Sequence, residues 1–201
     1  MKQFRARFPD TFIAADANHA YNFKEAFAMA RLLESLNYSW FEEPLAPDNY
    51  DDMAALRAST AVPIASGECE QTRFGFQRLA QTKSLDIFQP DIAYCGGLSE
   101  FQKIVALASA AHADVVPHCW GLKVNQAVAA SAISMLPQNP GRFERRSIYL
   151  EMDQTEHPVR DSIFSEAHEV RDGKLHFNDL PGLGVSVDEA AMDPFILRGD
   201  G

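Results

Sequence analysis

The stretch that decides the fold is Ser39-Trp40-Phe41-Glu42-Glu43-Pro44. It predicts a short buried strand that ends at a pair of carboxylates, because Pro44 cannot donate a ladder hydrogen bond and stops the strand. In a barrel of parallel strands, the active site is built from the C-terminal ends of the strands and the loops that follow them. An acidic residue at that place is therefore a candidate for catalysis or metal binding.

Two further stretches have the same form, an apolar run that ends at an acidic residue. Thr11-Phe12-Ile13-Ala14-Ala15 ends at Asp16, and Val62-Pro63-Ile64-Ala65-Ser66-Gly67 ends at Glu68. Glu42 lies 26 residues after Asp16 and 26 residues before Glu68. This equal spacing indicates that one structural unit repeats along the chain.

Helical patterns separate these strands. Asn22, with Glu25 three residues later, predicts a capped helix whose apolar stripe is Phe23, Phe27, Ala30 and Leu33. Asp48 is expected to cap the next helix, and a small-residue helix is expected over about 124–136. Further strands are predicted at 85–91, 114–118 and 147–151. Six strands alternating with five helices predict an α/β fold in which a parallel sheet of right-handed βα units is closed or partly closed as a barrel.

This partial barrel is expected to span residues 1–151. Residues 152–201 differ in composition and predict a C-terminal hairpin and tail, with Asp172-Gly173 between two short strands.

The composition narrows the class of function. The chain has 201 residues, 46% of them hydrophobic, and a net charge of −10 with scattered basic residues. That balance argues against nucleic acid and against an anionic membrane as partners, and favours cations or small molecules. With no signal-peptide pattern and no long apolar run, we expect a soluble, cytoplasmic protein.

The three strand-end carboxylates predict a metal site. Asp16, Glu42 and Glu68 should point into one mouth, where they would repel one another unless a cation lay among them. Oxygen-only ligands favour Mg²⁺ over softer metals. Each acid by itself would be an ordinary solvated residue, but three at equal spacing favour the metal site.

The next strand ends carry Asp91, His118 and Glu151. A carboxylate beside an imidazole holds one tautomer and makes a better base, so Asp91 and His118 are candidates for proton transfer. Glu151 could complete the ring of polar groups opposite the metal.

The cysteines Cys69, Cys95 and Cys119 suit a reducing compartment and lack the pairing of a zinc site. A thiol cluster near the site is conceivable, but we expect small apolar fillers near strand ends.

Taken together, these motifs resemble the enolase superfamily in its mandelate racemase/muconate lactonizing enzyme branch. The resemblance covers nearly all of residues 11–190 and rests on Asp16-Ala17-Asn18, Trp40-Phe41-Glu42-Glu43-Pro44, Ser66-Gly67-Glu68, Gln89-Pro90-Asp91, Cys95-Gly96-Gly97, Val116-Pro117-His118, Tyr149-Leu150-Glu151 and Pro181-Gly182-Leu183-Gly184. It implies Mg²⁺ ligands at Asp16, Glu42 and Glu68, a proton-transferring dyad of His118 and Asp91, and a hydrogen bond from Glu151 to the enolate oxygen.

The implied reaction removes the α-proton of a carboxylic acid and passes through an enediolate. The run from Asp16 to Tyr21, with Trp120, looks most like the sugar-acid dehydratases and the galactarolactone cycloisomerases. This similarity implies substrate contacts at Asn18, His19 and Trp120. Dehydration of a sugar acid is the first expectation; racemisation, lactone cycloisomerisation and a truncated, non-catalytic metal-binding remnant are the alternatives.

The resemblance also implies strands three to eight of a TIM-like barrel, without the family's N-terminal capping domain, its first two strands or its lysine pair. Two open sheet edges with apolar residues such as Phe12 and Ile148 would then need cover, which predicts a homo-oligomer or else a protein that needs the N-terminal part of the barrel supplied in trans.

Overall fold

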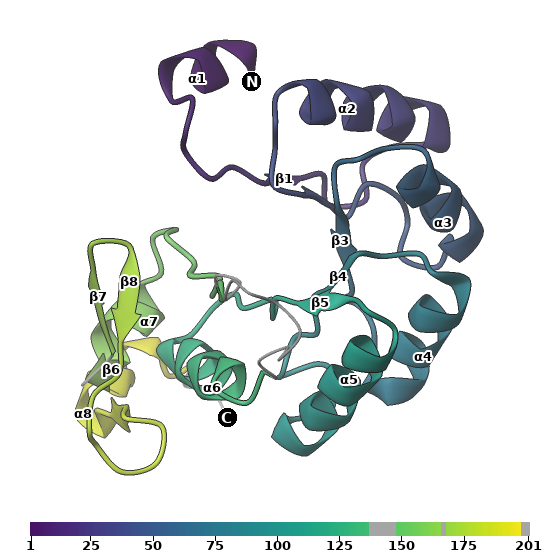
Figure 1. Ribbon diagram of the computed structural model, residues 1–201. Coiled ribbons are helices and arrows are strands. Elements are labelled where there is room, and N and C mark those ends of the chain that lie inside the picture. Colours follow the sequence, from purple (N-terminus) through teal and green to yellow (C-terminus); the bar gives the residue numbers. More distant parts are fainter. Residues whose placement is uncertain (137–147, 166–167, 198–201) are drawn as a thin grey trace. The chain divides into compact units, whose positions relative to one another are not determined.

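The computed structural model describes residues 1–136, 148–165 and 168–197. The chain divides into two compact units, Met1–Pro117 and His118–Gly201, and each is described by itself (Figure 1). The predicted boundary at residue 151 stays a prediction.

The first unit is built on a five-stranded parallel sheet in the order β1-β2-β3-β4-β5. Its strands are β1 (Ala15–Asp16), β2 (Phe41–Glu42), β3 (Ile64–Ser66), β4 (Ile87–Phe88) and β5 (Asp114–Val115). Its helices are α1 (Lys2–Arg7), α2 (Phe23–Ser35), α3 (Tyr50–Ala58), α4 (Thr72–Thr82) and α5 (Leu98–Ala110). Sequential order and parallel pairing are those of repeated βα units, as the sequence predicts.

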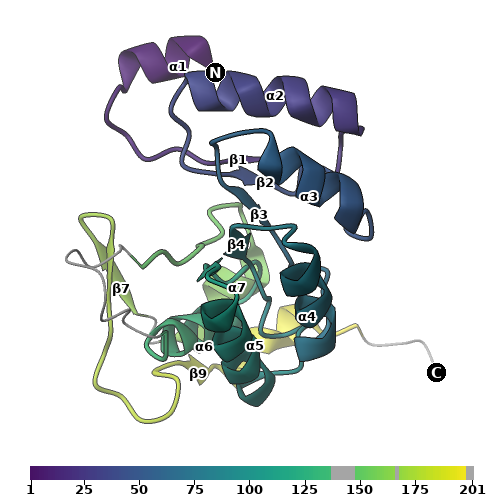
Figure 2. The same ribbon diagram turned by 45° about the vertical axis from the view of Figure 1, so that its right-hand side comes forward.

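Helices α2 to α5 form the outer layer of this unit. Consecutive helices lie side by side, which Figure 2 shows for α2 with α3 and for α4 with α5. The sheet supplies the other side of the core, where Phe41, Ile64 and Phe88 are buried. Prolines follow several strands, namely Pro44, Pro90 and Pro117. Because proline lacks an N–H, each of them ends the ladder close to the edge where the polar residues lie.

The predicted start of helix α2 is confirmed, whereas the predicted buried face of α2 and the predicted start of α3 need correction. The capping box of α2 is present, with Asn22 accepting from the Glu25 backbone and the Glu25 carboxylate accepting from the Asn22 N–H. Phe27, predicted in the buried stripe, is exposed, because Ala26, Ala30 and Leu33 form the inner face at helical spacing. Helix α3 begins after Asn49 rather than Asp48.

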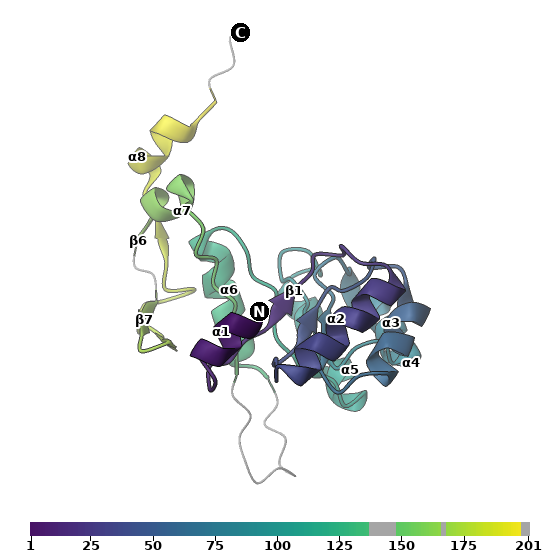
Figure 3. The same cartoon turned by 90° about the horizontal axis from the view of Figure 1, so that it is seen from above.

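The second unit has helix α6 and two small antiparallel pairs. Its strands are β6 (Phe164–Ser165), β7 (Glu169–Arg171), β8 (Lys174–His176) and β9 (Ser186–Val187), and its helices are α6 (Lys123–Ile133), α7 (Pro158–Ile163), α8 (Glu189–Met192) and the 3₁₀ turn η1 (Asp193–Phe195). The hairpin predicted around Asp172-Gly173 is confirmed as β7–β8. Helices α7 and α8 contact each other (Figure 3).

The prediction of a sixth strand at 147–151 is wrong for those of its residues that the structure describes. Residues 148–151 lie outside every strand, and Ser147 is outside the described residues. The short apolar run Ile148-Tyr149-Leu150 resembles a strand in sequence, but Ile148 and Tyr149 are exposed and the run belongs to none of the sheets of the described residues. Within the described part of the chain, no helix is long and apolar enough to cross a membrane.

Candidate active site

The three predicted metal ligands follow three neighbouring strands at one edge of the sheet. Asp16 ends β1 and Glu42 ends β2, and the two are register partners. Glu68 comes two residues after the last residue of β3, which pairs with β2 in parallel. Because parallel strands end at the same edge, the structure places all three carboxylates at or just after neighbouring strand ends of the first unit.

Local contacts fix two of these carboxylates. The Asn18 backbone N–H donates to Asp16 Oδ1 at 2.8 Å, and Trp40 Nε1 donates to Glu42 Oε2 at 2.8 Å. Three carboxylates repel one another, which favours such contacts with neighbouring donors.

The turn before Glu68 requires glycine. Gly67 has a φ of +130°, and a Cβ there would lie 2.9 Å from Phe76 Cε1. At the motif Ser66-Gly67-Glu68 the end of the strand therefore passes close to helix α4. This close packing fixes the backbone position from which the Glu68 side chain extends.

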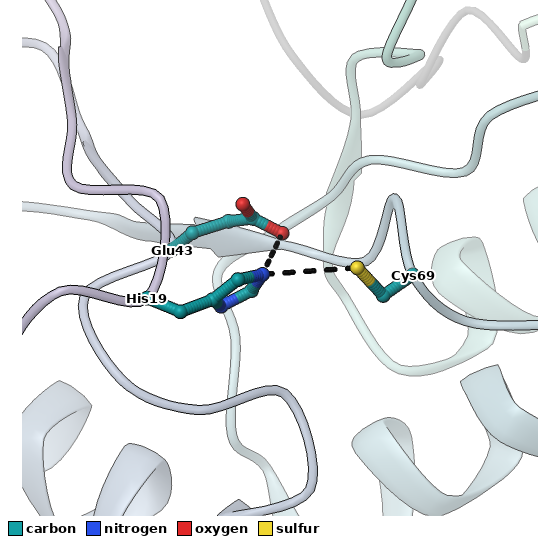
Figure 4. A group of neighbouring side chains, drawn as sticks. All are labelled: His19, Glu43 and Cys69. Atoms are coloured by element: carbon teal, nitrogen blue, oxygen red, sulfur yellow. Dashed lines mark hydrogen bonds and ion pairs between the residues drawn. The ribbon is translucent and has the colours of Figure 1, made fainter.

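A second group of side chains lies in the same three loops. Among the described residues, the one set of three histidine, cysteine or acidic side chains whose ligand atoms lie within 4.8 Å of one another is His19, Glu43 and Cys69 (Figure 4). Asp16, Glu42 and Glu68 do not form such a set. From sequence, His19 is predicted to contact the substrate, and Glu43 has no predicted role. One signal could have found the group: each acidic strand end is followed, one or three residues later, by another ligating residue.

Asp91 follows β4 and is buried. Its Oδ1 accepts from the Ala93 backbone at 2.7 Å and from the Tyr94 backbone at 3.3 Å. These bonds hold the carboxylate in a tight turn at the same strand-end edge.

His118, Trp120 and Glu151 belong to the second unit. The backbone N–H of Cys119 donates to Glu151 Oε2 at 2.7 Å, so the structure brings Glu151 to the segment that carries His118 and Trp120. Trp120 is exposed and His118 is half-buried. Asp91 and His118 lie in different units, and their pairing stays a prediction.

The cysteines differ in their surroundings. Cys95 and Cys119 are buried, as expected of apolar fillers. Burial raises the pKa of the Cys95 thiol to about 11, and the Asp91 charge adds to the effect. The expectation is wrong for Cys69, which is exposed and lies 3.7 Å from His19 Nε2, because it sits in the polar loop after β3 rather than in the core. Burial and the charges of Glu43 and Glu68 raise the pKa of the Cys69 thiol.

Glu70, next to Cys69, is held by a different partner. The Tyr50 hydroxyl donates to Glu70 Oε1 at 2.6 Å. Burial and this hydrogen bond raise the pKa of Tyr50 to about 12. Tyr50 therefore remains a donor at neutral pH, and the bond directs one oxygen of Glu70 toward helix α3.

The family follows from the match to its sequence model. Residues 1–191 match the model described as enolase C-terminal domain-like. The chain belongs to this enolase family. The predicted fold class, part of the (β/α) barrel of the enolase superfamily, is confirmed together with the recognition of its mandelate racemase/muconate lactonizing enzyme branch.

Similar proteins are sugar-acid dehydratases and cycloisomerases. A D-galactarolactone cycloisomerase from Agrobacterium fabrum is 35% identical over 187 residues, which cover 93% of this chain and 50% of that protein. The crystal structure of a 3,6-anhydro-D-galactonate cycloisomerase from Zobellia galactanivorans is 38% identical with a TM-score of 0.85, covering 94% of this chain and 52% of the other.

An enolase-superfamily relative has been crystallised with a metal. The L-talarate dehydratase from Polaromonas sp. JS666, complexed with Mg and L-glucarate, is 27% identical with a TM-score of 0.77, and the match covers 94% of this chain and 49% of the other. The chain spans about half the length of the curated relatives it matches.

Proposed function

We propose that this enolase-family chain carries the Mg²⁺ and proton-transfer residues of an enzyme that removes the α-proton of a sugar acid or its lactone. The observation that carries the proposal is the set of three carboxylates at the ends of neighbouring parallel strands, Asp16, Glu42 and Glu68. The donor set fits the metal, because Mg²⁺ prefers oxygen ligands and usually takes carboxylates from the protein and the rest from water and substrate.

The assignment of roles follows the proposed chemistry. The α-proton of a carboxylate is weakly acidic, because its removal leaves a doubly charged enediolate. When bound, Mg²⁺ supplies positive charge where that negative charge develops. His118 is proposed to remove the proton, with Asp91 as the carboxylate that orients its ring. Glu151 is proposed to hydrogen-bond the enolate oxygen, and Asn18 and Trp120 to contact the substrate.

Two outcomes of this shared step are proposed. In dehydration, the β-hydroxyl leaves with a proton as water, as in the relatives named sugar-acid dehydratases. Cycloisomerisation is the second candidate, and a specific observation favours it: the cycloisomerases from Agrobacterium fabrum and Zobellia galactanivorans are 35% and 38% identical to this chain.

Calorimetric titration of Mg²⁺ tests the metal site. We expect one binding event in the wild-type chain and its loss in Glu68→Gln, which keeps the shape of the side chain and removes its charge. Asp51→Asn is the matched control, since Asp51 is an exposed carboxylate in the first turn of α3. Indistinguishable isotherms for the wild type and Glu68→Gln would overturn the assignment.

Exchange of the α-proton in D₂O, followed by NMR on a panel of sugar acids and lactones, tests the base. We expect exchange that requires Mg²⁺ and is lost in His118→Asn, by roughly a hundredfold or more for a general base. Exchange that persists in His118→Asn would show that another group is the base, and Mg²⁺ binding without any exchange would contradict catalysis by this chain.

A further inference from the structure

Three side chains that the proposed Mg²⁺ site does not use converge in the first unit. His19 follows β1, Glu43 follows β2 and Cys69 follows β3 (Figure 4). His19 Nε2 lies 3.1 Å from Glu43 Oε1 and 3.7 Å from Cys69 Sγ. Their ligand atoms all lie within 4.8 Å of one another, so one ion could contact all three.

The ring of His19 is oriented so that Nε2 is the nitrogen that can bind a metal ion. His19 Nδ1 lies 2.9 Å from the carbonyl oxygen of Leu45. A carbonyl can only accept, so Nδ1 carries a proton and Nε2 is the atom that faces Glu43 and Cys69. Histidines that bind metals commonly donate their other ring N–H to a carbonyl or carboxylate in this way. A substrate contact through Nε2 would have to replace the contacts it already makes.

The Glu43 carboxylate is buried, and a positively charged partner would stabilise it there. Its side chain is only 1% exposed, and burying a carboxylate is costly unless a cation or hydrogen-bond donors accompany it. The backbone is also held in an uncommon conformation, with φ of +43° at Glu43 and +62° at His19. Non-glycine residues in this left-handed region cost free energy, which the surrounding contacts must offset.

The two separations from His19 Nε2 match those of a tetrahedral zinc site. Ordinary Zn–N, Zn–O and Zn–S bond lengths at a tetrahedral angle put the nitrogen about 3.3 Å from the oxygen and about 3.6 Å from the sulfur. The observed values of 3.1 and 3.7 Å are close to both. A mixed nitrogen, oxygen and sulfur donor set favours Zn²⁺ over Mg²⁺, and three protein ligands leave the fourth position for water or another ligand.

We propose that His19, Glu43 and Cys69 form a second metal site, distinct from the carboxylate site, that binds Zn²⁺. The site draws one ligand from each of the loops that carry Asp16, Glu42 and Glu68, so the bound ion ties these three loops together. Because Cys69 is exposed, the ion can enter from solvent on that side.

Cobalt(II) is the probe, because a thiolate bound to Co²⁺ gives a charge-transfer absorption in the near ultraviolet that oxygen ligands do not give. The reduced, metal-free chain is first saturated with Mg²⁺ and then titrated with Co²⁺. We expect one equivalent to produce the band and Zn²⁺ to displace it. Cys69→Ser should abolish the band, and His19→Gln should weaken cobalt binding by roughly tenfold or more. Cys119→Ser, the matched cysteine control, should retain it.

Glu68→Gln separates this proposal from the proposed function. We expect it to lose Mg²⁺ binding and to keep the cobalt band, whatever the catalytic outcome. Glu43→Gln, checked for native folding by circular dichroism, should weaken cobalt binding. No band in the wild type, or a band of equal strength in Cys69→Ser, would overturn the zinc site, and loss of the band in Glu68→Gln would show that the two sites are one.

Discussion

The two units of the chain are stabilised by different kinds of contact. In residues 1–117, large apolar side chains from strands and helices are fully buried together, as Phe41, Phe76, Phe88 and Phe101 show. In the described part of residues 118–201, the buried set consists mainly of the alanines of α6, with Ile163 and Phe164. Large apolar side chains such as Phe177 and Leu197 are exposed there.

A buried ion pair contributes to the described part of the second unit. The buried Arg160 side chain pairs with Asp153 Oδ2 at 2.7 Å and with Asp161 Oδ1 at 3.0 Å, and it donates to the Asp153 carbonyl. A core built on a repeated strand and helix can be recognised from apolar periodicity, whereas a core built on polar links cannot, because these links follow no period. Four tests, three of them matched pairs of substitutions across the units, sharpen or break this contrast.

The largest effect is expected from Phe88→Ala in β4. Phe88 is 1% exposed, and its ring centroid lies 5.5 Å from the ring centroid of Phe76. Truncation therefore leaves a cavity and should lower the free energy of unfolding by about 3–5 kcal/mol. Phe177→Ala is the partner in the second unit; its side chain is 52% exposed, and we expect a loss below about 1 kcal/mol. Denaturant titration measures both, and equal losses would break the contrast.

A smaller loss is expected from Arg160→Met, which keeps the apolar stem and removes the charge. Asp153 would then be left in place without its positive partner. Burial alone would raise the pKa of the Asp153 carboxyl, but hydrogen bonds from Thr155 and the charge of Arg160 lower it below its usual range. A lowered pKa gives stability that is present above the pKa of the unfolded chain and is lost as pH falls through the folded value.

The difference in stability between the wild type and Arg160→Met should therefore be largest near neutral pH and become smaller in acid. Thermal unfolding at about pH 7 and about pH 3 compares them. A difference that stays constant over this interval would show that the ion pair does not stabilise the second unit.

Gly67→Ala is expected to cost about 2 kcal/mol, because it combines a strained φ with a clash. The new Cβ would meet Phe76 at 2.9 Å, and Phe76 is fully buried. In the second unit, Gly182 has a φ of +70° and nothing within 4 Å of a Cβ, so Gly182→Ala should cost only about 1 kcal/mol for the backbone. Chemical denaturation of both variants is the measurement, and a Gly182→Ala loss as large as that of Gly67→Ala would refute the packing difference.

The smallest effects concern helix caps. Asn22→Ala removes the acceptor of the Glu25 N–H from a helix whose inner face is buried, and should cost about 1 kcal/mol. Asp188 caps α8 by accepting from Ala190 and Ala191, but that helix buries none of its residues. Asp188→Ala should cost roughly 0.3 kcal/mol, because fraying of α8 exposes little. Global unfolding followed by circular dichroism decides whether the order holds.

Most of the first unit could be predicted from sequence. Strand-end acids 26 residues apart, the Asn22–Glu25 cap and the prolines after strands are local signals, and the parallel sheet follows from their repetition. The predicted strand at 147–151 failed where the structure describes it, because a short apolar run becomes a strand only when a neighbour supplies ladder hydrogen bonds.

The sequence by itself determined which loops carry polar chemistry and that Asp16, Glu42 and Glu68 follow adjacent strands. Only the tertiary structure decided that His19, Glu43 and Cys69 meet. Their convergence depends on strand register and on left-handed backbone at His19 and Glu43, which turn side chains from different loops toward one point. Spacing along a chain fixes where a loop begins, whereas the direction of each side chain in that loop depends on backbone angles that packing imposes.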